Sequence, residues 1–178
     1  MERRLSSKRI YEGRILNLRV DEVEVSHNGH LAKREVVEHG SAVAILARDE
    51  QGRFLLVKQF RYPLSAELLE IPAGLMESGE TPEVAAQREL REETGYRAER
   101  WTAMPSVWTT PGFSNEKIFI FFADELTFAP LSPDDDEDIS LVRMTDEEAK
   151  ALLFSSDPQD AKTMFALAWY FVAKKELH

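Results

Sequence analysis

Residues 74–95 carry the strongest structural signal in the chain and read Gly-Leu-Met-Glu-Ser-Gly-Glu-Thr-Pro-Glu-Val-Ala-Ala-Gln-Arg-Glu-Leu-Arg-Glu-Glu-Thr-Gly. Thr81 is a good helix N-cap, and Pro82 suits the first helical position, where its missing N–H costs no hydrogen bond. Gly95 suits a left-handed helix stop. The stretch therefore predicts a loop followed by a helix that runs from Pro82 to residue 93 or 94.

Three glutamates share one face of this helix. Glu89 and Glu93 are four residues apart and Glu92 is three from Glu89, so the three carboxylates fall within an arc of about 100°. Like charges at this spacing destabilise a helix, which favours a bound cation. Mg²⁺, with Mn²⁺ as the alternative, takes oxygen ligands and often shares them with substrate phosphates. A merely solvated acidic face is the competing interpretation.

The residues before this stretch predict strands. Residues 14–25 and 32–38 alternate around Asn28-Gly29, a dipeptide typical of hairpin turns, and predict a largely polar two-stranded ribbon. Residues 42–48 and 53–60 predict a buried hairpin, because their apolar side chains run nearly unbroken. An isolated polar ribbon is marginal in water, so we expect the first one to pack on another surface.

The residues around and after the stretch add further elements. Strands are expected over 68–72, 101–108, 116–123 and 141–144, and helices from Thr145 and over 160–174. Strands mixed with two or three helices, without regular strand–helix–strand alternation, predict an α+β or sandwich-like mixed fold.

Composition excludes several classes of function. The 178 residues hold 22 Lys and Arg against 32 Asp and Glu, a formal charge of −10, and no cysteine. An acidic surface repels polyphosphate backbones and anionic membranes, so neither nucleic acid nor a membrane is an expected partner. No apolar run approaches the ~18 residues that cross a bilayer, and the basic start lacks the apolar region of a secretory signal. We expect a cytoplasmic protein.

The spacing Gly-x5-Glu-x7-Arg-Glu-Leu-x-Glu-Glu-x-Gly from Gly74 to Gly95 has a chance frequency of roughly one in 10⁸ per start position. It resembles the Nudix box, with Tyr96 as its one departure, where the family usually has an aliphatic residue. The resemblance implies the Nudix fold, a mixed β-sheet between helices. It divides the chain into an N-terminal β-ribbon, residues 1–40, and a hydrolase domain, residues 41–178. It also implies Mg²⁺-dependent hydrolysis of a nucleoside diphosphate linked to another group.

The same resemblance assigns roles to residues of the box. The metal ligands would be three carboxylates and one backbone carbonyl, at Glu89, Glu92, Glu93 and Ala73. Arg88 matches the arginine that pairs with the acid at Glu80 and orients the helix. A loop carboxylate among residues 134–138 could act as general base. We select Glu137 by its offset from Ile139, with Asp136 as the alternative.

Sequence outside the box resembles the ADP-ribose pyrophosphatase subfamily. Pro111 follows Gly95 by 16 positions, one mark of that group. Further matches lie in residues 34–39, 59–61, 70–74 and 111–116. The resemblance implies hydrolysis of ADP-ribose to AMP and ribose 5-phosphate. A GDP-mannose or other nucleotide-sugar pyrophosphohydrolase, and a nucleotide-binding regulatory module without turnover, are the alternatives.

Four residues are candidates for binding the substrate. Arg61 ends an apolar strand, where its guanidinium could clamp a phosphate. Glu116 follows a Pro-Gly-Phe turn and could point at the metals. In the resembling family, residues matching Arg34 and Glu35 reach the partner subunit's site. The resemblance thus implies a homodimer with exchanged N-terminal segments, against the alternative of a monomer.

Overall fold

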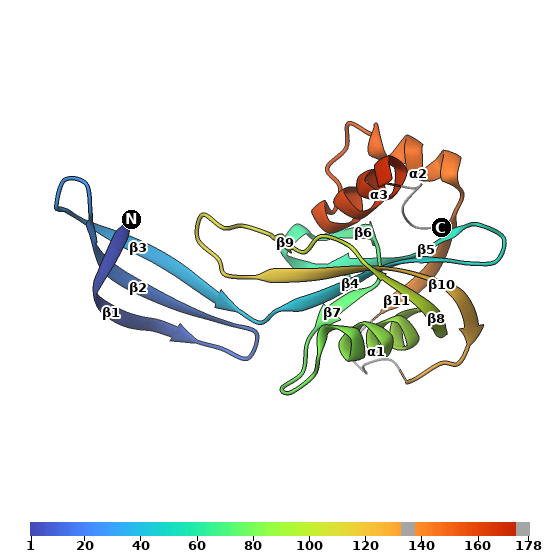
Figure 1. Ribbon diagram of the computed structural model, residues 1–178, viewed down its shortest axis with the longest axis horizontal. Helices are drawn as coiled ribbons and strands as arrows, with labels where there is room; N and C mark the ends of the chain where they lie inside the picture. Colours follow the sequence, from blue (N-terminus) through green and yellow to red (C-terminus); the bar gives the residue numbers. More distant parts are fainter. Residues whose placement is uncertain (133–137, 174–178) are drawn as a thin grey trace. The chain divides into compact units, whose positions relative to one another are not determined.

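The computed structural model describes residues 1–132 and 138–173 (Figure 1). The chain divides into two compact units. The first contains Met1–Ser41 together with Val107–Lys117, and the second contains Ala42–Ser106 together with Ile118–His178. The sequence places a boundary near residue 40, and the first unit in addition includes the later segment 107–117.

The first unit is built on a three-stranded antiparallel sheet in the order β1 (Glu2–Glu12), β2 (Leu16–Val25) and β3 (His30–His39). The turn between β2 and β3 contains Gly29 at φ 68°, which confirms the predicted hairpin. The same unit holds β9 (Val107–Trp108) and the turn after it. This turn is tied to β3 because Val37 N donates to the Phe113 carbonyl at 2.8 Å.

The prediction of a two-stranded ribbon was wrong, because β1 adds a third strand. Every residue of β1 is exposed, and no apolar alternation marks it as a strand. Backbone pairing with β2 and side-chain ion pairs hold it. Arg3 Nη2 lies 2.6 Å from Glu24 Oε2 on β2, and Glu2 Oε1 lies 2.5 Å from Arg34 Nη2 on β3.

The second unit contains a mixed sheet with the central order β11–β5–β4–β10–β8. β4 and β10 run parallel and the other neighbours run antiparallel. Two short strands extend it, β6 on β5 and β7 on β4. The bounds are β4 (Ala42–Arg48), β5 (Phe54–Arg61), β6 (Ala66–Glu70), β7 (Ala73–Leu75), β8 (Tyr96–Ala103), β10 (Lys117–Phe128) and β11 (Ile139–Met144), with a 3₁₀ turn η1 (Tyr62–Leu64) after β5.

Helices cover both faces of this sheet (Figure 1): α1 (Pro82–Thr94) on one face, and α2 (Asp146–Leu153) with α3 (Ala161–Ala173) on the other. The core against α1 includes Val43, Ile45 and Leu90. On the α3 face, the Tyr170 ring lies 5.0 Å from that of Phe54. A mixed sheet between helices confirms the predicted α+β fold. None of the helices in the described part of the chain is long and apolar enough to span a membrane.

Local signals predicted the helix starts well. Thr81 accepts a hydrogen bond from Val84 N at the start of α1, and Gly95 ends this helix at φ 77°. Thr145 and Glu148 form the capping box expected from the sequence. β8 begins at Tyr96, five residues before the expected start at 101, because the chain enters the sheet directly after Gly95.

Candidate active site

Helix α1 presents the three glutamates of the box. Its apolar stripe, which includes Ala86 and Leu90, is fully buried against the sheet. This anchoring fixes the rotation of the helix about its axis. Glu89, next to the stripe, is 8% exposed, whereas Glu92 and Glu93 are half-buried.

Arg88 forms hydrogen bonds with several carboxylates of this face. Its Nη1 donates to Glu89 Oε1 at 2.6 Å and to Glu92 Oε2 at 2.9 Å. Its Nε and Nη2 each lie 3.0 Å from a Glu80 oxygen, and Nη2 also donates to the Leu75 carbonyl at 3.0 Å. Hydrogen bonds from Arg88 hold the pKa of the Glu80 carboxyl below its usual range. Hydrogen bonds to these carboxylates, of which the one to Glu80 has the largest effect, raise the pKa of Arg88.

Strand β7 passes close beneath these carboxylates. A Cβ at Gly74 would lie 2.2 Å from the Glu89 carboxylate, so only glycine leaves room for that side chain in its present position. The neighbouring Ala73 N–H donates to Glu93 Oε2 at 3.1 Å. The structure therefore brings Ala73 and Gly74 together with two of the three glutamates.

Divalent-metal binding at this face depends on its carboxylate donors. Among residues 1–132 and 138–173, no group of three or more His, Asp or Glu side chains is arranged to hold a metal ion. The sequence predicts a bound cation that offsets the repulsion among the three glutamates. In the structure, Arg88 provides part of that positive charge. The donors that Glu89, Glu92 and Glu93 offer are all carboxylate oxygens, which match a hard ion such as Mg²⁺ or Mn²⁺. The donor chemistry fits the metal, and Arg88 contacts Glu89 through Oε1 and Glu92 through Oε2.

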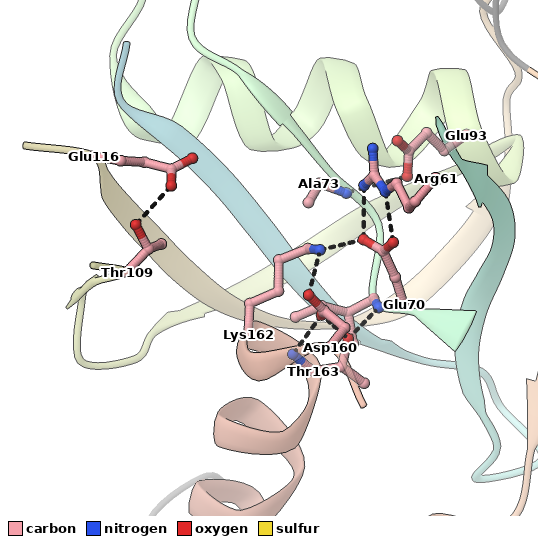
Figure 2. A network of polar contacts seen from close by, with 10 residues as sticks. Arg61, Glu70, Ala73, Glu93, Thr109, Glu116, Asp160, Lys162 and Thr163 are labelled. Atoms are coloured by element: carbon pink, nitrogen blue, oxygen red, sulfur yellow. Dashed lines mark hydrogen bonds and ion pairs between the residues drawn. The ribbon is translucent and has the colours of Figure 1, made fainter. Parts of the chain in front are cut away.

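Arg61, at the end of β5, binds a buried carboxylate (Figure 2). Its Nε and Nη2 each donate to one oxygen of Glu70 at 2.7 Å. The Glu70 side chain is 2% exposed, and Lys162 from α3 contacts the same carboxylate. Although burial alone would raise it, the pKa of Glu70 is lowered by the hydrogen bond from Arg61 and the charge of Lys162. The Glu70 hydrogen bond, aided by the charge of Glu93, raises the pKa of Arg61.

Sequence reasoning did not select Glu70 or Lys162 as site residues. A signal was available for Glu70, which interrupts the apolar run Leu68-Leu69-Glu70-Ile71. A buried carboxylate requires a cationic partner. Nothing in the sequence identifies which cation provides it, because Lys162 lies 92 residues away.

The other candidate substrate-binding residues belong to the first unit. Arg34 is exposed and pairs with Glu2, and Glu35 next to it is exposed as well. Glu116 accepts a hydrogen bond from Thr109 Oγ1 at 2.6 Å and lies 3.4 Å from His39 Nδ1.

The two candidates for the general base, Glu137 and Asp136, lie outside the described residues.

Comparison with known proteins gives matches along the chain. Residues 38–167 match the NUDIX domain, and residues 2–37 match the nucleoside diphosphate sugar hydrolase N-terminal domain. The ADP-ribose pyrophosphatase of Bacillus subtilis (strain 168) is 41% identical over 170 residues, which cover 94% of this chain and 91% of that protein. The methanol dehydrogenase activator of Bacillus methanolicus is 38% identical with the same coverage.

Two further matches bear on substrate and fold. The GDP-mannose pyrophosphatase of Yersinia pestis (strain Pestoides F) is 30% identical over 146 residues, 76% of this chain and 73% of that protein. The crystal structure of an ADP compounds hydrolase shares the fold at a TM-score of 0.87 and 23% identity, covering 98% of this chain and 95% of that one. The match to the NUDIX domain, residues 38–167, spans well over half of the 178 residues, and this chain therefore belongs to the NUDIX family.

Proposed function

We propose that the chain hydrolyses the pyrophosphate bond of ADP-ribose to AMP and ribose 5-phosphate, with Mg²⁺ as the metal. The proposal rests mainly on one observation. Glu89 and Glu93, on one face of α1, both lie against β7, where Glu89 packs on Gly74 and Glu93 accepts the Ala73 N–H. The 41% identity to an ADP-ribose pyrophosphatase over nearly the whole chain supports the choice of substrate.

The proposed roles follow from the positions of the donors. Glu89, Glu92 and Glu93, with the Ala73 carbonyl, hold the metal. These residues would hold a divalent ion whose charge would offset that of the phosphoryl oxygens and would favour deprotonation of the attacking water. Arg88 orients the carboxylates, two of which it already contacts. Because Arg88 carries a fixed positive charge, it also offsets their mutual repulsion before the metal binds.

The remaining residues bind the substrate and move a proton. Arg61 uses two of its five N–H donors for Glu70, which leaves three for a phosphate. A water oxygen bonds to one phosphorus while the bridging P–O bond breaks, and a carboxylate, Glu137 or Asp136, takes the water proton. Arg34 and Glu35 contact the nucleoside of a substrate bound to the partner subunit. Glu116 supplies a further carboxylate to the substrate site.

The decisive experiment is a substrate panel with product identification. ADP-ribose, GDP-mannose, UDP-glucose and dinucleoside polyphosphates are compared by kcat/KM with Mg²⁺ and with Mn²⁺, and products are identified by ³¹P NMR. We expect ADP-ribose to be hydrolysed most efficiently, to AMP and ribose 5-phosphate. GDP-mannose is the second candidate, favoured by the 30% identical relative, and a higher kcat/KM for it would replace the first. Tight binding with no product for any compound would instead support a regulatory nucleotide-binding module.

We further propose that the protein works as a cytoplasmic homodimer with exchanged N-terminal segments. The first unit leaves several large apolar side chains exposed, and these would be covered by a second copy. They include Leu5, Ile10, Tyr11, Ile15 and Leu31, each at least 45% exposed.

A further inference from the structure

The Asp160 carboxylate, just before α3, contacts two residues of the first turn of this helix. Asp160 Oδ2 accepts hydrogen bonds from Thr163 N at 2.9 Å and from Thr163 Oγ1 at 2.6 Å. Its other oxygen, Oδ1, lies 3.1 Å from Lys162 Nζ. Asp160 therefore fixes the directions in which both Lys162 and Thr163 leave the helix.

These two side chains hold the end of β6. Lys162 Nζ donates to Glu70 Oε2, and Thr163 Oγ1 accepts the buried Ile71 N–H at 2.8 Å (Figure 2). Two residues further along, the Ala73 N–H donates to Glu93 on α1. The segment 70–73 is thus held by α3 on one side and by α1 on the other, and it connects the helix of the box to the last helix.

The contacts at Glu70 determine the orientation of Arg61. Oε2 of Glu70 is shared between Lys162 Nζ and Arg61 Nη2, while Oε1 accepts from Arg61 Nε. A bidentate pair fixes the plane of the guanidinium, because both N–H···O bonds must be satisfied together. Lys162 restrains the carboxylate, and the carboxylate restrains the guanidinium plane.

The restrained guanidinium lies close to the proposed metal site. Figure 2 shows Arg61 between Glu70 and Glu93, and the charge of Glu93 acts on Arg61. With Nε–H and one Nη2–H bound to Glu70, the donors that remain are on the other side of the guanidinium. A phosphate that approaches the α1 carboxylates meets those donors only if Arg61 keeps this orientation.

We propose that Lys162, fixed by Asp160, is a positioning residue for the hydrolysis: acting through Glu70, it holds Arg61 in the orientation that binds a substrate phosphate. The inference rests on the proposed function, because it assigns Arg61 a phosphate ligand. Lys162 itself touches no substrate. Its effect is therefore on substrate binding more than on the chemical step.

The kinetic test compares Lys162→Met with a matched control, Lys58→Met. Lys58 pairs with Glu67 at 2.5 Å across the neighbouring β5–β6 strands, but in an exposed position. With ADP-ribose and Mg²⁺, we expect K162M to raise KM at least tenfold and to change kcat less than threefold. K58M should leave both within twofold of the parent. A K162M enzyme whose KM stays within twofold of the parent overturns the proposal.

A double-variant cycle tests whether Lys162 acts through Arg61. In an Arg61→Ala background, adding K162M should change KM less than twofold, because the residue being positioned is gone. A further tenfold rise would show that Lys162 acts by another route and overturns the proposal. If K162M does not fold, Asp160→Asn takes its place: a KM raised threefold or more supports the proposal, and an unchanged KM overturns it.

A spectroscopic readout separates this proposal from the proposed function. The ¹⁵Nε–H resonance of Arg61 is assigned by its loss in R61A and followed without substrate or metal. We expect it to exchange slowly with water in the parent and in K58M, and to shift and exchange faster in K162M. An unmoved resonance overturns the positioning role even in an active enzyme. A moved resonance in a protein that hydrolyses no ADP-ribose supports the positioning of Arg61 and removes the proposed function.

Discussion

Single side chains on α1 carry the proposed chemistry, and Glu93 is the most direct test. Glu93→Gln keeps the oxygen that accepts the Ala73 N–H but removes the negative charge that a metal ligand needs. We expect kcat for ADP-ribose to fall about a hundredfold or more. The thermal unfolding midpoint should stay within about 2 °C of the parent. Turnover within a few-fold of the parent would show that Glu93 is not a metal ligand.

Gly74 allows a second test of the same face, made from the strand side. Gly74→Ala places a methyl group where the Glu89 carboxylate lies, so this carboxylate must move. The end of a flexible side chain moves cheaply, and we expect a stability loss of only about 1 kcal/mol. Activity should fall more than tenfold, since the displaced oxygen is a proposed metal ligand.

Gly112→Ala is the matched control, because a Cβ at Gly112 meets nothing within 4 Å. Its activity and its unfolding midpoint should both match the parent. If G74A also keeps full activity, the position of Glu89 against β7 does not matter for catalysis.

The elements β5, β6 and α3 meet at Glu70, which makes the stability of this junction dependent on pH. The folded-state pKa of Glu70 is below its ordinary value of 4.5. A lowered folded pKa means that the stabilisation is fully present above the ordinary value and is lost as pH falls through the folded value. Glu70→Gln leaves Arg61 and Lys162 without their buried anion, and we expect a loss of about 3 kcal/mol near neutral pH.

Urea unfolding of the parent and E70Q checks this expectation. The difference in unfolding free energy should be largest at about pH 7 and should shrink as the pH falls below 4.5 and through the lowered folded-state pKa of Glu70, where the parent carboxyl takes up its proton. A difference that stays constant over this range would show that the charge of Glu70 does not stabilise the junction.

An element could be predicted from the sequence where the residues that determine it lie within it or next to it. Helix α1 was predicted closely, because Thr81, Pro82 and Gly95 lie within or beside it. Strand β1 was not predicted, because it is exposed along its length and forms by pairing with a strand that follows it. The three glutamates could be placed on one face from spacing alone. The contact between Arg88 and Glu92 follows the i,i+4 spacing of a helix, whereas the contact between Lys162 and Glu70 joins residues 92 positions apart and cannot be read from spacing.

For the whole molecule, the prediction concerns assembly, and it starts from the large apolar side chains that the first unit exposes. Leu5, Ile10 and Tyr11 on β1 are each at least 45% exposed, although their neighbours are mainly polar or charged. A strand that exposes such residues to water is more stable with a second surface against it. A twofold-symmetric partner would cover the same strand on both copies and would link assembly to activity through Arg34 and Glu35.

Sedimentation velocity at micromolar concentration, together with kinetics of a chain lacking residues 1–38, tests this link. We expect the full chain to sediment as a dimer. The truncated chain should sediment as a monomer whose KM for ADP-ribose is at least tenfold higher, because it lacks Arg34 and Glu35. The double variant Arg34→Ala, Glu35→Ala in the full chain separates the two effects, since it should raise KM while the protein remains a dimer. A full chain that sediments as a monomer, or a truncated chain that keeps the parent KM, would mean that each subunit's substrate site is complete without its partner's N-terminal segment.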